Sequence, residues 1–245
     1  GGRVEILIEK KIDDRNAMAI TKSNRPIKVN DELFIENSKI SGVVIHKEDY
    51  LCTISFSETI DEILDNFGSI PLPPYMNRNP EDKDYERYQT VYADNNSERS
   101  SAAPTAGLHF DNELLKEIGE KGVNVAPITL DIGLGTFKPI TESDFSKHKM
   151  HTENITLSRA TSDLINETIK SKAKIISVGT TSLRCLESIY QKFGSIKPYE
   201  GETDIFIYPG FKFNVVDSLI TNFHLPKTTL LLLVSAFAGE HTIKA

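Results

Sequence analysis

The pattern of predicted strands and helices changes near residue 70, and this change limits the folds that the chain can adopt. Residues 1–57 hold only short β-branched or apolar runs broken by Asn, Asp, Lys and Gly, which predicts a small barrel or curled sheet. Residues 57–68 predict a helix, and the prolines of 70–75 make a stiff linker. Beyond it, strands alternate with helices. We therefore predict a small β-barrel domain over residues 1–68 and an α/β domain with a mixed, mostly parallel main sheet over residues 69–245.

Within the larger domain, capping residues and hydrophobic periodicity place the elements. Asp111 and Ser158 are of the types that cap helix starts. We expect helices over 85–92, 113–120, 158–172, 181–193 and 228–237. We expect strands over 123–131, 174–178, 204–208 and 215–220.

Composition excludes several classes of protein. With 245 residues, 39% of them hydrophobic, the chain can bury a sizeable core, which excludes a disordered or low-complexity protein. Its two cysteines are far apart in sequence and suggest neither a disulfide framework nor a metal site, which favours the reducing cytoplasm. The longest apolar run, residues 230–238, is half the length that a membrane helix needs. The chain starts without Met or a leader, so we expect it to begin within a strand.

Charge is unevenly distributed along the chain. The net charge is −7, yet residues 1–30 carry seven Lys or Arg against four Asp or Glu, whereas residues 31–100 carry six against fifteen. A protein that coats a duplex would carry a basic surplus over a whole domain. Any nucleic-acid contact is therefore expected to be local, with the basic segment 10–28 as its best candidate. A solvated strand face is the alternative.

Two glycine-containing segments follow predicted strands or precede helices, where α/β sheets build ligand crevices. Residues 100–110 form an irregular loop with His109 at its exit toward a helix, which predicts backbone amides and an imidazole facing a ligand. A tight loop with a hydrogen-bonded His explains it equally well. Residues 128–139 run into Gly133, Gly135 and Thr136, which permit close backbone approach to a ligand but do not complete the dinucleotide fingerprint.

Residues 148–154 place histidines close to a glutamate. His151 and Glu153 alternate onto one face of a strand, whereas His148 falls outside that register. No nearby cluster supplies further metal ligands. We therefore favour a His–Glu pair that orients substrate or moves a proton over a metal site.

Residues 175–187 and 203–226 are the last two segments with candidate functional residues. The first strand ends in Gly179, Thr180, Thr181 and Ser182 at a helix start, which predicts an anion or carboxylate pocket. Arg184 and Glu187 are three residues apart and can pair on one helix face. The alternative to the pocket is a capped helix with a surface ion pair. Asn222 and His224 lie between an apolar strand and an apolar helix, where polar groups are used or hydrogen-bonded. The alternative for His224 is a structural role as a hydrogen-bonded histidine in the core.

Taken in order, these segments resemble the S-adenosylmethionine:tRNA ribosyltransferase-isomerase family of queuosine biosynthesis. The resemblance rests on the runs A-A-P-T-A-G-L-H-F (102–110), I-T-L-D-I-G-L-G-T-F-K-P-I (128–140), H-K-M-H-T-E (148–153), V-G-T-T-S-L-R-C-L-E-S (178–188), T-D-I-F-I-Y-P-G-F-K-F (203–213) and V-D-S-L-I-T-N-F-H-L-P-K-T-T-L-L-L-L-V-S-A-F-A-G (216–239). These runs tie residues 100–239 to the family. The opening G-G-R-V-E-I-L also fits its barrel region.

The resemblance implies an α/β domain with an inserted β-barrel. It also implies that the barrel is incomplete at its N-terminus and the α/β domain at its C-terminus, because the family runs longer at both ends. S-adenosylmethionine would act as ribosyl donor and substrate, with no metal or redox cofactor. The acceptor would be tRNA with 7-aminomethyl-7-deazaguanine at the wobble position, and the products epoxyqueuosine-tRNA, adenine and methionine. We further expect a cytoplasmic monomer with no membrane partner.

The family's chemistry needs a base, an acid near the departing adenine, and donors for ribose and carboxylate oxygens. The acid/base candidates are His109, His151 and His224, with Glu153 orienting His151. Arg184 with residues 179–182 suits a carboxylate. Thr105, Thr136 and Asn222 suit ribose or base edges, and the substrate-binding set also includes Gly107, Gly133 and Gly135. Two alternatives stay open: a catalytically inactive, truncated tRNA-binding remnant, and a metal-dependent hydrolase that uses His148, His151 and Glu153.

Overall fold

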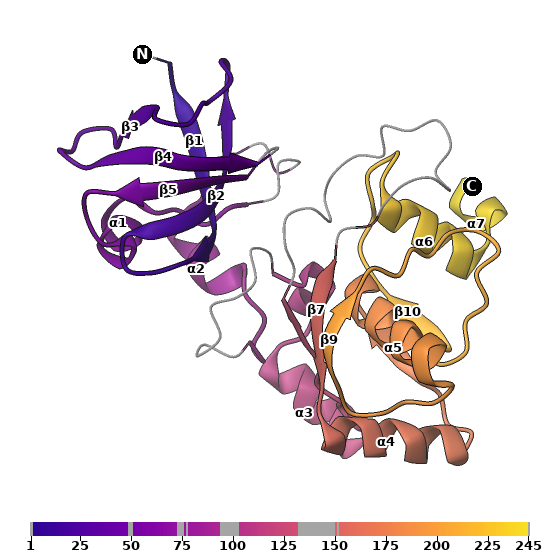
Figure 1. The fold of residues 1–245 in the computed structure, drawn as a ribbon. Coiled ribbons are helices and arrows are strands. Elements are labelled where there is room, and N and C mark those ends of the chain that lie inside the picture. The colour runs from indigo at the N-terminus through magenta and orange to yellow at the C-terminus, as the bar shows by residue number, and fades with distance from the viewer. Residues whose placement is uncertain are drawn as a thin grey trace. The chain divides into compact units, whose positions relative to one another are not determined.

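The computed structural model describes residues 2–48, 51–72, 76, 78–93, 103–131, 150 and 152–244. The chain divides into two compact units, Gly1–Glu86 and Arg87–Ala245, and Figure 1 shows the elements of each. Within the described ranges, none of the helices combines the length and the apolar character needed to cross a bilayer.

The smaller unit is built on a curled antiparallel sheet. Its strands are β1 (Val4–Lys11), β2 (Asn16–Ser23), β3 (Glu32–Phe34), β4 (Ser41–Glu48) and β5 (Leu51–Phe56). They pair in the order β1-β2-β5-β4-β3, and every neighbouring pair is antiparallel (Figure 1). The sheet is a half-barrel because no ladder joins β1 to β3 among the described residues. The short strands predicted before residue 57 are confirmed.

Alternating burial explains why these segments form one curled sheet. Ala17, Ala19, Cys52 and Ile54 are each at most 1% exposed and face the core, whereas the residues between them are only partly buried. Helix α1 (Ile60–Phe67) adds Ile60 to the same core. Burial of this apolar face is the main stabilising contribution in the unit.

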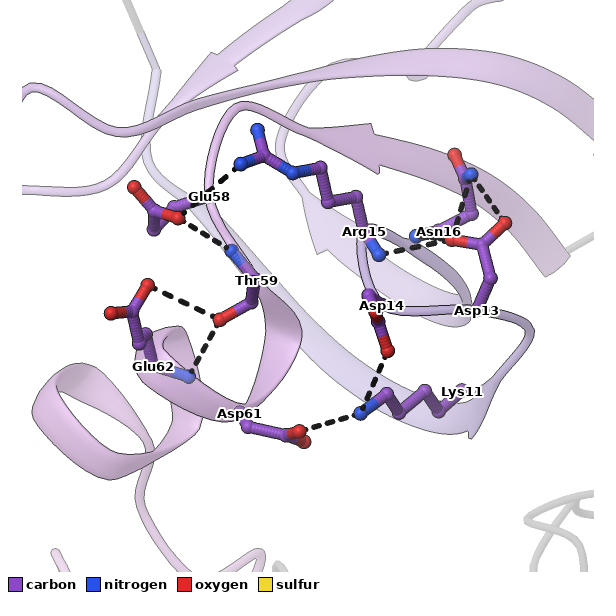
Figure 2. Close-up of polar contacts among 9 residues, drawn as sticks. All are labelled: Lys11, Asp13, Asp14, Arg15, Asn16, Glu58, Thr59, Asp61 and Glu62. Atoms are coloured by element: carbon purple, nitrogen blue, oxygen red, sulfur yellow. Dashed lines mark hydrogen bonds and ion pairs between the residues drawn. The ribbon is translucent and has the colours of Figure 1, made fainter.

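The start of α1 is held at the surface by polar contacts, which Figure 2 shows. The Thr59 hydroxyl accepts a hydrogen bond from the Glu62 amide at 3.3 Å and so caps the helix. Lys11 Nζ lies 2.6 Å from an Asp61 carboxylate oxygen and thereby ties the end of β1 to the helix. Helix α2 (Asp82–Arg87) follows, with the buried Asp84 accepting two hydrogen bonds from the Arg78 guanidinium.

The larger unit combines two small sheets with helices. Its elements are a 3-10 helix (Thr105–His109), α3 (Asn112–Glu120), β6 (Thr129–Asp131), β7 (Glu153–Leu157), α4 (Arg159–Lys170), β8 (Ile176–Val178), α5 (Thr180–Phe193), β9 (Tyr199–Thr203), β10 (Ser218–Ile220), α6 (Thr229–Ala238) and α7 (Glu240–Lys244). Strands β6, β7 and β9 form one sheet, and β8 and β10 form the other. The shared core is built around Ile155, Leu157, Leu183, Leu186, Ile189 and Leu233.

The predicted mostly parallel main sheet is wrong. Strand β7 pairs antiparallel with both β6 and β9, and β8–β10 is the one parallel pair between described strands. The prediction assumed that each helix crosses between strands of a single sheet. Instead, α4 leads from β7 into a strand of the other sheet, and β9 returns beside β7 in the opposite direction.

Several element boundaries also differ from the predictions. Residues 204–208 form no strand, although burial alternates along them; β9 precedes them, and Ile205 bonds to side chains through both its amide and its carbonyl. The helix predicted over 85–92 overlaps α2 only over residues 85–87, and the strand predicted over 123–131 shortens to β6. The helices predicted after Asp111 and Ser158 are confirmed, since each of these side chains accepts a hydrogen bond from its helix's first turn.

Candidate functional site

The site starts from the parallel pair β8–β10, whose carboxyl ends lie side by side. Val178 is in register with Ile220, and the Gly179 amide donates a 2.9 Å hydrogen bond to the Ile220 carbonyl. Gly179 has φ 93°, a left-handed conformation that favours glycine. The pairing therefore brings residues 179–182 and 221–224 to one sheet edge, the place where α/β sheets bind ligands.

The first turn of α5 supplies donors at this edge. Gly179 is the N-cap residue and offers no side-chain cap, so the amides of Thr180, Thr181 and Ser182 have no acceptor within the helix. Thr180 is buried, and the next two residues are half-buried. A helix start of this kind carries partial positive charge and suits a carboxylate or phosphate group.

The 3-10 helix contributes a second group of polar side chains. The Thr105 hydroxyl donates to Asn222 Oδ1 at 3.2 Å, and Asn222 Nδ2 lies 3.4 Å from His109 Nε2. These contacts join two segments more than 100 residues apart in sequence. The structure thus places Thr105, His109 and Asn222, three of the residues predicted for the site, in one network.

His224 lies in the same loop as Asn222. Its Nε2 is 3.1 Å from the Thr221 hydroxyl, and the side chain is half-buried. Desolvation lowers the pKa of His224 from its ordinary value. The imidazole is therefore neutral at neutral pH and can accept a proton.

A buried ion pair lies behind the first turn of α5. Arg184 Nη1 is 2.6 Å from Glu153 Oε2, with side chains 2% and 1% exposed, and Arg184 Nε donates to the Ile205 carbonyl at 3.3 Å. Arg184 Nη2 is buried and has no hydrogen-bond partner in the part of the chain that the structure describes. Glu153, the predicted orienter of His151, is thus held by Arg184.

The expected pairing of Arg184 with Glu187 is wrong. The Glu187 carboxylate instead accepts hydrogen bonds from the amides of Asn214, Val215 and Val216, at 2.9 to 3.2 Å. Their spacing is that of a surface pair, but both side chains are buried. Arg184 contacts Glu153 at the start of β7, whereas Glu187 contacts the segment 214–216. Between them on the helix, burial raises the pKa of the Cys185 thiol to about 12, so this cysteine is not a reactive thiolate.

Part of the predicted site lies outside the described residues. This holds for Gly133, Gly135, Thr136, His148 and His151. Within the described ranges no group of three metal-binding side chains occurs.

Two aromatic residues that were not predicted lie beside predicted site residues. Phe223, between Asn222 and His224, is fully exposed at 108% of its reference area. Tyr92 packs so closely on Gly107 that a Cβ there would overlap its hydroxyl, and desolvation raises the pKa of the Tyr92 phenol. The position of Phe223 within the motif was a usable signal, whereas nothing in the sequence linked Tyr92 to Gly107.

Comparisons with known proteins identify the family of the chain. A family model described as queuosine biosynthesis protein matches residues 1–245. A relative from Psychrobacter sp. (strain PRwf-1) is 43% identical over 261 residues, which are 100% of this chain and 67% of the relative. One from Francisella tularensis subsp. mediasiatica (strain FSC147) is 47% identical over 99% of this chain and 71% of its own length. Both are named S-adenosylmethionine:tRNA ribosyltransferase-isomerase.

A solved structure is also similar. It is the S-adenosylmethionine tRNA ribosyltransferase from Thermotoga maritima, with 28% sequence identity, a TM-score of 0.47, and coverage of 98% of this chain and 66% of that one. This chain is thus shorter than the relatives that it matches. Because the family model and the relatives match it from end to end, the chain belongs to the queuosine biosynthesis protein family, that of the S-adenosylmethionine:tRNA ribosyltransferase-isomerases.

Proposed function

We propose that this chain transfers and isomerises the ribosyl moiety of S-adenosylmethionine onto 7-aminomethyl-7-deazaguanine in tRNA. The products are epoxyqueuosine-tRNA, adenine and methionine. The observation that carries the proposal is the family match over residues 1–245, together with relatives that bear the name of this activity. An inactive tRNA-binding remnant is not favoured by these relatives.

The proposed chemistry begins at the sulfonium, which acidifies the adjacent 5′-carbon. A base takes that proton, and adenine is expelled with help from an acid. The substrate amine then attacks the ribose, and methionine leaves. His224 suits the base because partial burial favours its neutral, proton-accepting form. His109 suits the acid near the departing adenine, and His151 stays a further candidate.

Binding roles follow from the groups at the sheet edge. The amides at the start of α5 suit the methionine carboxylate of S-adenosylmethionine. Thr105 and Asn222, which already share a hydrogen bond, suit the ribose oxygens or a base edge. The exposed ring of Phe223 offers a stacking face for a nucleobase.

Arg184 takes an indirect role in this proposal. Its side chain is buried and bound to Glu153, so it positions α5 behind the carboxylate site. Its Nη2 is buried and has no hydrogen-bond partner among the described residues. S-adenosylmethionine is consumed as a substrate, and we propose no additional cofactor. We also propose that the protein acts as a monomer in the cytoplasm, where its tRNA substrate is found.

The test is mass-spectrometric detection of adenine and methionine after mixing the chain with S-adenosylmethionine and tRNA that carries 7-aminomethyl-7-deazaguanine. We expect equimolar release and a matching gain in tRNA mass. His224→Gln and His109→Gln should each slow adenine release by roughly 10² or more. His46→Gln, an exposed histidine of the smaller unit, is the matched control and should release adenine at the unmodified rate. Binding of S-adenosylmethionine without any release would contradict the proposal and support the remnant.

A further inference from the structure

A hollow of about 460 Å³ lies in the smaller unit, in a region that the proposed chemistry does not use. It is formed by the end of β2, the loop that follows, and β4. Its polar lining consists of three cationic side chains and three uncharged ones: Lys22, Arg25, Lys47, Thr21, Ser23 and Asn24. None of the residues that line it is acidic.

Hydrogen bonds fix the backbone of this hollow. Lys47 Nζ donates to the Ile27 carbonyl at 2.7 Å, which joins β4 to the loop, and Ile27 itself is buried in the core. The Ser23 hydroxyl donates to the Arg25 carbonyl at 2.5 Å. Lys22 at the end of β2 and Arg25 in the loop are both exposed, so their cationic side chains reach solvent from a backbone that these hydrogen bonds hold in place.

The charges of the hollow are not neutralised locally. In the part of the chain that the structure describes, no ion pair involves any of its three cations. Glu5 is in register with Lys22 across the β1–β2 ladder but does not line the hollow. The chain as a whole carries a net charge of −7, so this is a local positive site on an acidic protein. Such a site attracts anions, and the planar guanidinium of Arg25 fits phosphate oxygens in pairs.

We propose that this hollow binds phosphate groups of the tRNA backbone and so helps to position the RNA substrate. The inference rests on the proposed function, which makes tRNA the substrate. The three cations come from two strands and a loop. A nucleic-acid strand carries one phosphate after another and can therefore contact several of these cations, whereas a single small anion contacts fewer of them. Phosphate contacts of this kind contribute affinity and orientation without reading sequence.

The experiment measures binding of tRNA that carries 7-aminomethyl-7-deazaguanine at several KCl concentrations. In the double variant Lys22→Glu/Arg25→Glu, we expect the Kd for tRNA to rise at least about tenfold. The slope of log Kd against log salt should fall by about one for each cation removed. Affinity for S-adenosylmethionine should stay unchanged, which shows that the variant is folded. The melting temperature should fall only slightly, because the new carboxylate at position 22 is in register with Glu5.

The matched control is Lys39→Glu/Lys174→Glu, which makes the same change in net charge. Lys39 follows β3 and Lys174 precedes β8; both are exposed and lie outside the basic segment 10–28. This control should weaken tRNA binding much less. If both double variants weaken tRNA binding equally, or if neither weakens it, the inference is overturned. Ribosyl transfer by the wild-type chain would still support the proposed function in that case. A wild-type chain that neither binds nor modifies tRNA would contradict both this inference and the proposed function.

A free phosphate ion presents the same anionic oxygens as the tRNA backbone and is the other ligand that the hollow could bind. Sodium phosphate, added at constant ionic strength, should displace tRNA no better than chloride does. Displacement that is much stronger, and is lost in Lys22→Glu/Arg25→Glu, would identify a small-anion site and overturn the assignment to RNA.

Discussion

Two ion pairs of equal length lie in opposite environments in the two units. Lys11–Asp61 in the smaller unit and Arg184–Glu153 in the larger both span 2.6 Å, but the first pair is 34% and 65% exposed and the second 2% and 1%. An exposed pair contributes about 0–1 kcal/mol, because water and salt screen it. Removing one partner of a buried pair leaves a charge without compensation and costs about 3–5 kcal/mol. Burial, and not distance, determines what each pair does for its unit.

The largest effect is expected where the buried pair is broken. Arg184→Leu takes the Arg184 guanidinium away from the buried Glu153 carboxylate, and we expect the free energy of unfolding to fall by about 3–5 kcal/mol. Urea unfolding followed by circular dichroism measures this.

The matched variant is Arg184→Leu/Glu153→Leu, which removes both charges. It should recover a large part of the lost stability, because an apolar pair of similar volume carries no desolvation penalty. A loss below about 1 kcal/mol in the single variant would show that this pair behaves like an exposed one.

The next effect comes from close packing in the larger unit. A Cβ at Gly107 would overlap the Tyr92 hydroxyl and the Thr90 methyl group, so Gly107→Ala should cost about 1–3 kcal/mol. Tyr92→Phe removes the hydroxyl, so the double variant Gly107→Ala/Tyr92→Phe should recover part of the lost stability. Urea unfolding curves measure the free energy of unfolding of each variant. Independent, additive effects of the two changes would contradict the contact.

A smaller, graded effect is expected at His224, which is half-buried and so lies between the two extremes. Desolvation lowers its folded pKa below 6.5, so the neutral base is fully available above that pH and is lost as pH falls through the folded pKa. The rate of adenine release should therefore fall about tenfold per pH unit on an acid limb that lies below pH 6.5. A limb above pH 6.5, or one that persists in His224→Gln, would rule out this base.

The smallest effect is expected at the exposed pair. A double-mutant cycle with Lys11→Met and Asp61→Asn should give a coupling of at most about 1 kcal/mol, and added salt should reduce it further. Figure 2 shows this pair beside the start of α1. A coupling that approaches that of the buried pair would undo the comparison between the units.

Local signals predicted the elements of the fold better than their pairing. Asp111 and Ser158 mark helix starts because a side-chain oxygen beside free amides acts within one turn. The direction of β9 beside β7 depends instead on contacts between residues far apart in sequence, such as Glu153 and Thr203, which are 50 positions apart. No local pattern specifies such a pairing, which is why the main sheet was predicted with the wrong strand direction.

The site shows the same division. The sequence predicted Thr105 and Asn222 as substrate-binding residues and His109 as an acid/base candidate, and the structure shows that the three contact one another. Helical spacing suggested Glu187 as the partner of Arg184, but tertiary packing gives Arg184 to Glu153 instead. Spacing on one helix could not reveal this, because the competing acceptor comes from a different strand.

Helix α5 is held behind its first turn from two sides. Arg184 binds Glu153 in β7, and one turn later Glu187 accepts three consecutive amides of residues 214–216. The helix start cannot shift without breaking these buried contacts, so its amides are already oriented before any ligand arrives. Little conformational entropy is then lost when a carboxylate binds there, and the affinity reflects the new contacts rather than the ordering of the protein.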